Sequence, residues 1–121
     1  MLGFKSKLLG QILVAKHSLK ALRYGGSITL TTEITAEELV IHGAPKTTVN
    51  RATEGFVYSV ALELPSRIRI NAVSPGLLEA SAPDVGKDFP GIEPVSATRV
   101  AREYRKSVYG IQTGQIFRGY P

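Results

Sequence analysis

The sequence predicts an α/β layered fold, in which parallel strands alternate with helices on the faces of one sheet. Two observations lead to this class: apolar residues recur at helical spacing in three segments, and short extended segments follow them. Units of this kind form parallel sheets with right-handed crossovers. The 121 residues contain no repeat, linker or low-complexity tract, so one domain is expected over residues 1–121.

Residues 1–24 are expected to form the first helix, because apolar residues recur three or four positions apart. Gly25 and Gly26 are expected to end it, since glycine adopts the left-handed conformation that closes helix ends. Ser27 to Thr32 reads SITLTT, a β-branched run that predicts a strand. Residues 33–43 are expected to be a loop packed against the core, with a short helix as the alternative. The apolar face of the first predicted helix comprises Phe4, Leu8, Ile12, Ala15, Leu19 and Leu22.

The second helix is expected to begin at Thr47 or Thr48 and to stop before Pro65, which disfavours helical backbone in the residue preceding it. Residues 68–73 alternate apolar and polar side chains and predict a strand that Pro75 and Gly76 terminate. Residues 77–94 contain three prolines and two glycines, which indicates a long loop.

Ser96 is expected to cap a third helix that ends at Gly110. Residues 115–117 predict a last short strand. The chain is therefore expected to hold about three strands and three helices. The predicted buried face of the third helix is Ala97, Val100, Ala101, Tyr104 and Val108.

The composition narrows the function classes. The chain has a formal net charge of +5 and no cysteine, which excludes a disulfide scaffold, a cysteine nucleophile and a thiolate metal site. A chain without cysteine fits a reducing compartment, so a cytoplasmic location is expected. His17 and His42 lie far apart and lack further ligands at suitable spacing, so no metal site is expected.

The basic N-terminal part raises two further hypotheses. No acidic residue precedes Glu33, and a basic apolar segment is also typical of a transit peptide or an interfacial membrane helix. The apolar runs are too short to span a membrane and the segment leads directly into Gly25 and Gly26, which favours a folded helix. The aromatic residues form no stacking pattern, which disfavours nucleic-acid binding. Neither a membrane nor a nucleic acid is expected as a partner.

One segment carries a family resemblance. Ala61 to Gly76, ALELPSRIRINAVSPG, resembles the helix-to-strand junction of short-chain dehydrogenases/reductases, where a strand commonly ends in Asn-x-x-Ser/Ala-Pro-Gly. GSITLTT, NRATEGFVYSVALEL and Thr113-Gly114-Gln115 match further family landmarks in the same order. The chain is thus identified as the C-terminal half of a divergent family member. The resemblance implies half of a Rossmann-type doubly wound parallel sheet and, by family, an NAD(P)-dependent oxidoreductase.

The nucleotide-binding part of the family pattern has no match. The family's domain begins with a strand, a glycine-rich turn and a helix, which bind the dinucleotide pyrophosphate. Gly3, Gly10, Gly25 and Gly26 form no such turn. We therefore expect that this chain alone binds no cofactor and that an N-terminal half is missing from it.

The family's catalytic positions also differ. The family transfers hydride with a tyrosine as acid and base, a lysine one helical turn later and a serine earlier in the chain. An alignment without a gap places the tyrosine position at Lys46, the lysine position at Asn50 and the serine position at Glu33. A phenol exchanges protons near neutral pH only when a cation stabilises the phenolate, and Lys46 cannot replace the phenol. We expect no catalytic residue and no activity of the isolated chain, which would make it a pseudoenzyme.

Ser74, Pro75 and Gly76 match the segment that turns the family's chain past the nicotinamide. Two interpretations are open, a relic cofactor contact and a strand-ending turn, and the turn is favoured because the pyrophosphate site has no counterpart. Glu33 and Lys46 are also a candidate ion pair, which would contribute less than about 1 kcal/mol if exposed.

Three functional hypotheses remain: an inactive truncated family member, an oxidoreductase completed by a missing N-terminal half, and an interaction module. In the family, the helices that match residues 1–24 and 46–64 commonly pair across a dimer axis, and Gly55 and Ser59 would let such helices approach closely. The strand at residues 27–32 is expected to have an open edge, which offers strand addition as a second route. A homodimer is expected, with the helix route favoured.

Overall fold

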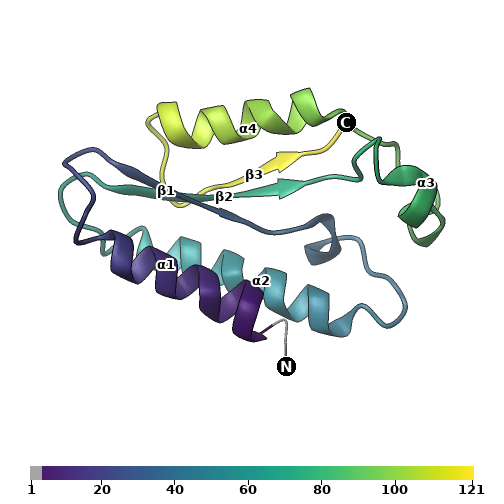
Figure 1. Cartoon of the computed structure of the whole chain (residues 1–121), viewed down its shortest axis with the longest axis horizontal. Coiled ribbons are helices and arrows are strands. Elements are labelled where there is room, and N and C mark those ends of the chain that lie inside the picture. The colour runs from purple at the N-terminus through teal and green to yellow at the C-terminus, as the bar shows by residue number, and fades with distance from the viewer. Residues whose placement is uncertain (1–3) are drawn as a thin grey trace.

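The computed structural model describes residues 4–121, with side chains from Lys7 onward. Its centre is a parallel sheet in the order β1-β2-β3, formed by β1 (Ser27–Thr31), β2 (Arg69–Pro75) and β3 (Ile116–Gly119). The π-helix η1 (Phe4–Leu9), helix α1 (Gly10–Ser18) and helix α2 (Ala44–Val60) lie on one side of the sheet, and α4 (Ala97–Tyr109) covers the other (Figure 1). The predicted α/β class with parallel strands is confirmed.

The core is divided by the sheet into two clusters. Ile28, Leu30, Ile70 and Ala72 face α1 and α2, whereas Val73 packs with residues of α4 and β3 on the other side. Strand β2 is therefore buried on both faces, as the central strand of a parallel sheet is. Of the polar positions in its alternating pattern, Asn71 is buried and Arg69 is half-buried.

The first helix ends earlier than predicted, at Ser18 instead of near Tyr24. The Ser18 hydroxyl donates to the Val14 carbonyl at 2.6 Å, a local bond that competes with regular helix geometry. Leu19 and Leu22 still pack against the core as expected. The side chain of Phe4, the first member of the predicted face, lies outside the described residues.

The second helix begins at Ala44, before the predicted start at Thr47 or Thr48, and ends at Val60. The early start is allowed because Pro45 occupies the first turn, where no backbone N–H is needed. The alternative for residues 33–43 is confirmed by the 3-10 helix η2 (Ile34–Ala36). The predicted loop 77–94 contains α3 (Ala82–Val85) and the 3-10 helix η3 (Gly86–Asp88).

Ser96 caps α4 as predicted, because its hydroxyl accepts from the Arg99 backbone N–H at 3.1 Å. The predicted buried face of α4 is wrong in part. Val100 is buried and Tyr104 is half-buried, as predicted. The other three residues of that face are exposed: Ala97, Ala101 and Val108. Glu103 and Ser107 take their place. Glu103 can be buried because Arg99 and Lys106 pair with it at 2.6 and 3.0 Å, and Ser107 shares a 2.6 Å hydrogen bond with Thr29.

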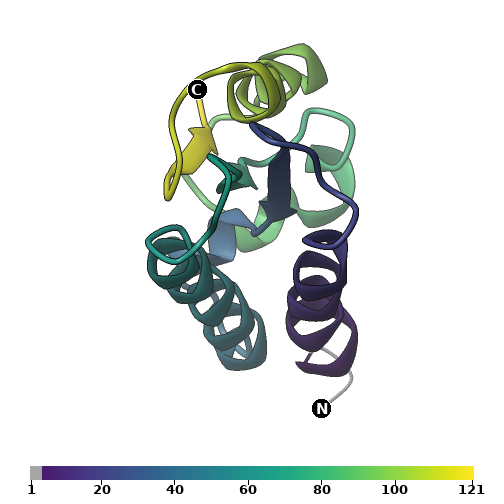
Figure 2. The same ribbon diagram turned by 90° about the vertical axis from the view of Figure 1, so that its left-hand side faces the viewer.

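The outer edge of β1 is partly covered. The Gln11 side chain accepts from the Thr31 backbone N–H at 2.8 Å and donates to the Thr31 carbonyl at 3.0 Å. Figure 2 shows α1 running on the β1 side of the molecule. The edge is therefore less open than the sequence predicts, because strand addition at Thr31 requires release of Gln11. No helix of residues 4–121 is long and apolar enough to cross a membrane.

Candidate functional site

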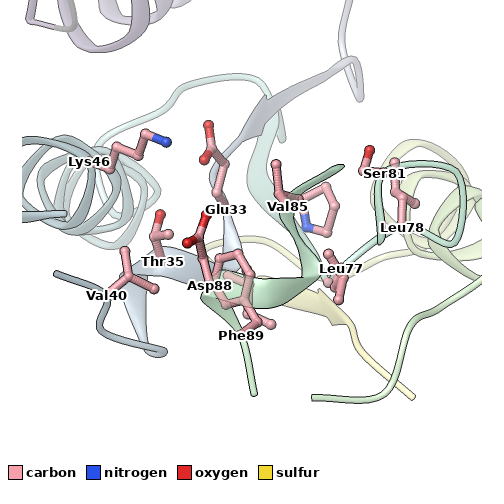
Figure 3. Close-up of a pocket in the computed structure, with 13 residues that line it drawn as sticks. Glu33, Thr35, Val40, Lys46, Leu77, Leu78, Ser81, Val85, Asp88 and Phe89 are labelled. Carbon is pink, nitrogen blue, oxygen red and sulfur yellow. The ribbon is translucent and has the colours of Figure 1, made fainter. Parts of the chain in front are cut away.

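A pocket of about 280 Å³ lies where β1 and β2 end. Its walls come from segments that follow the two strands, from the start of α2 and from the α3–η3 region (Figure 3). In parallel α/β sheets, ligands bind at the carboxyl ends of the strands. This carboxyl-edge pocket is therefore the candidate site. Its lining includes Glu33, Thr35, Lys46, Pro75, Gly76, Leu77, Asp88 and Phe89.

Of the three residues that the ungapped alignment assigns to the family's catalytic positions, two lie at this pocket. Glu33 and Lys46 both line it, from the end of β1 and the first turn of α2 (Figure 3). The candidate ion pair between them is not formed, because Glu33 pairs with Lys7. Lys7 belongs to η1, which passes the carboxyl end of β1. In the described part of the chain, Lys46 has no carboxylate at ion-pair distance.

Asn50, at the lysine position, lies outside the pocket. It is buried, and its side-chain amide donates to the Thr35 hydroxyl at 2.8 Å. Thr47 donates to the Thr35 carbonyl at 2.7 Å. These two bonds fix η2 against α2, so Asn50 positions the wall of the pocket without facing a ligand.

The turn after β2 is tightly packed. Ser74 is fully buried and shares a 2.8 Å hydrogen bond with the Tyr120 hydroxyl, so its side chain does not face the pocket. Pro75 and Gly76 line the pocket. A Cβ added at Gly76 would lie 2.9 Å from the Gly119 carbonyl oxygen, closer than real Cβ contacts come. Packing against the end of β3 thus requires glycine at this position.

Tyr120 is a residue that sequence reasoning missed, since it follows β3 without a motif. Burial raises the pKa of the Tyr120 phenol above its usual value, and the bond to Ser74 only partly offsets this. A phenol with a raised pKa is a poorer source of phenolate. Among the residues that the structure describes around the carboxyl-edge pocket, none is a tyrosine.

Comparison with known proteins agrees with this architecture. The sequence profile of the family described as Enoyl-(Acyl carrier protein) reductase matches residues 3–106. The chain belongs to the short-chain dehydrogenase/reductase family. A search of curated proteins found no match.

Several solved structures are similar. The protein lin1944 from Listeria innocua shares 43% identity and a TM-score of 0.91 over 94% of this chain and 57% of its own. A small-chain dehydrogenase in complex with NADPH shares 30% identity and a TM-score of 0.80 over 95% of this chain and 58% of its own. Another small-chain dehydrogenase shares 34% identity and a TM-score of 0.77 over 95% and 53%. This chain spans little more than half the length of these relatives.

The carboxyl-edge pocket does not fit a whole dinucleotide. Its charged side chains are Glu33, Asp88 and Lys46, so carboxylates outnumber cations where a pyrophosphate would need positive charge.

Proposed function

We propose that this chain forms the substrate side of an NAD(P)-dependent short-chain dehydrogenase/reductase and that the isolated chain catalyses no hydride transfer. The observation that carries the proposal is the carboxyl-edge pocket, which lies where the fold binds ligands and is lined by Glu33 and Lys46. The ungapped alignment assigns these two residues to the family's serine and tyrosine positions. Family membership and the NADPH complex of a relative with 30% identity support the cofactor class.

The chemistry of the lining supports inactivity. The family's proton transfer needs a phenol beside a cation, and neither Glu33 nor Lys46 supplies a phenol. Asn50 carries no charge and its amide is used by Thr35. Ser74, Pro75 and Gly76 serve the packing of β2 against β3, which favours a strand-ending turn over a relic cofactor contact. Activity would therefore need a dinucleotide site and a proton donor from polypeptide outside this chain.

Calorimetric titration of the chain with NADPH and NADH tests the proposal. We expect no saturable binding with a dissociation constant below about 100 μM, because the described pocket lacks a pyrophosphate site. The NADPH-binding relative serves as the positive control. Saturable binding tighter than that limit, or cofactor-dependent reduction of any carbonyl compound by the chain alone, would falsify the proposal.

A second candidate function is homodimerisation through α1 and α2, favoured by the apolar side chains that these helices expose. Leu13 and Val14 of α1 are exposed, as is Tyr58 of α2. Gly55 lies one turn before Tyr58, and a Cβ added there meets nothing within 4 Å. A Cβ at this position therefore makes no clash within the described monomer, and a larger side chain there is expected to obstruct a close partner.

We expect light scattering after size exclusion to give a dimer for the parent chain. Gly55→Leu should shift the equilibrium toward monomer, because the larger side chain prevents close helix approach, and Gly55→Ala should not. A monomeric parent, or a dimer that Gly55→Leu leaves intact, contradicts this route.

A further inference from the structure

A second pocket lies at the opposite, amino-terminal edge of the sheet. Its volume is about 400 Å³, within the range of about 300–1,000 Å³ for ligand pockets. Each of its walls is a connection that leads into a strand: Tyr24 and Gly25 before β1, residues 61–69 before and at the start of β2, and residues 110–113 before β3. We call it the amino-edge pocket.

This pocket is positively charged. Arg67 and Arg69 line it, and none of its described lining residues is a carboxylate. The Arg69 guanidinium is fixed by bonds to the carbonyls of Ser107 and Val108 at 2.7 and 2.9 Å, which leave its charge uncompensated. Arg67 is exposed and takes part in no ion pair of residues 7–121. A bound anion would therefore find one fixed cation and one with free donors.

The backbone conformation at Ser66 and Arg67 is strained. Ser66 and Arg67 have φ of 57° and 53°, and they are the two central residues of a turn closed by the Ile68 N–H and the Pro65 carbonyl at 3.0 Å. Turns with two positive φ values strongly favour glycine or asparagine, and strained residues of other types cluster at ligand sites. The Ser66 carbonyl also accepts from the Gly25 N–H at 2.9 Å, which ties this turn to the wall before β1.

The other part of the lining is apolar. Tyr24 is 73% exposed and Ile111 is 93% exposed, so both side chains are accessible to a ligand at this pocket. Aromatic rings bind against such side chains, and a planar carboxylate pairs with a guanidinium through two parallel hydrogen bonds.

We propose that the amino-edge pocket binds a small aromatic anion, with its ring against Tyr24 and Ile111 and its carboxylate on Arg67. The site is separated from the carboxyl-edge pocket by the length of the sheet, so this inference goes beyond the proposed function and does not depend on it.

The test uses the full chain and 2-naphthoate as the probe, followed by amide NMR. We expect saturable shifts at Gly25, Gly110 and Thr113, and binding weaker by about tenfold for the neutral isostere 2-naphthalenemethanol. Arg67→Gly should weaken naphthoate binding by about tenfold, because it removes the guanidinium. Ser66→Gly is the matched control, since it relieves the same kind of backbone strain and keeps Arg67.

Thermal unfolding separates binding from folding. Both glycine variants should melt at a higher temperature than the parent, because glycine adopts positive φ without strain. Lost binding in Arg67→Gly then cannot come from a damaged fold. The proposal is overturned by equal naphthoate affinity in the two variants, by equal affinity for the neutral isostere, by shifts confined to other surfaces, or by no saturation up to about 5 mM.

Discussion

The pockets at the two ends of the sheet differ in charge and in backbone strain. At the carboxyl edge, Glu33 pairs with Lys7 and Asn50 bonds Thr35. At the amino edge, Arg67 pairs with no carboxylate of residues 7–121 and its backbone is strained. The comparison teaches that position in a fold does not by itself make a site. Each pocket has a lysine or arginine that is unpaired within residues 7–121, Lys46 or Arg67, but only the amino-edge pocket has no carboxylate in its described lining.

The largest expected effect comes from restoring the family motif. Asn50→Lys places a charge in a buried position and breaks the bond to Thr35, so the free energy of unfolding should fall by about 3 kcal/mol. Lys46→Tyr alone changes an exposed residue and should cost less than about 0.5 kcal/mol. The double variant should show no NADPH oxidation with a panel of aldehydes and ketones, because nothing described in this chain holds the hydride carrier in place.

Urea denaturation and an NADPH absorbance assay check both parts. Cofactor-dependent turnover that appears only in the double variant would show that the carboxyl edge needs no further polypeptide. An unchanged midpoint for Asn50→Lys would show that Asn50 is not a structural residue.

A smaller effect is expected at the turn after β2. Gly76→Ala should lower the free energy of unfolding by about 2 kcal/mol, because the added Cβ meets backbone of the last strand. Gly86→Ala, in the loop that lines the same pocket, is the control: its added Cβ makes an ordinary contact of 3.9 Å with Ala82. Equal urea midpoints for the two variants would mean that Gly76 is not held by packing and would reopen the interpretation as a cofactor contact.

The sequence predicts the elements well where burial follows a simple period. The strands at Ile28 and Ile70 are examples. The Ser96 cap could also be predicted, because its signal lies within one segment of the chain. The buried polar residues could not be predicted. Asn71 is buried because it bonds the Gln112 carbonyl and the Gln115 N–H, which lie far along the chain. The alternating pattern predicts the strand but carries no information on such partners.

The candidate site shows the same division. Glu33, Lys46 and Gly76 could be placed at one pocket because the family motif orders them along the chain. The bond between Asn50 and Thr35 could not, nor could the contact of Tyr120 with Ser74. The amino-edge pocket could not be predicted either. Ala61–Gly76 and Thr113–Gln115 resemble the family, but the three connections that form the pocket meet only after folding.

At the amino edge, we expect substitutions at Ser66 and Gly25 to change the free energy of unfolding in opposite directions, because one relieves backbone strain and the other creates it. Ser66→Gly should raise the free energy of unfolding by about 1 kcal/mol, because it removes a left-handed serine. Gly25→Ala should lower it by about 1 kcal/mol, since Gly25 has a φ of 76° although its added Cβ meets no neighbour. Urea denaturation measures both. A pair of changes with the same sign would contradict the backbone origin of these effects.

The smallest expected effect is a pH dependence that belongs to the carboxyl edge. Burial raises the pKa of Tyr120 above its usual value of 10.0, so the folded state favours the neutral phenol. The contribution of the neutral Tyr120 phenol to the free energy of unfolding is therefore fully present below about pH 10. It is lost as the pH rises through the folded-state pKa of Tyr120. Tyr120→Phe removes this titration together with the bond to Ser74, so the variant is less stable at neutral pH but loses less stability in alkali. Urea midpoints of both proteins at several pH values from about 8 to about 11 measure the two slopes. Parallel slopes would show that the fold does not keep the half-buried Tyr120 phenol neutral. The two edges would then differ only in charge and in backbone strain.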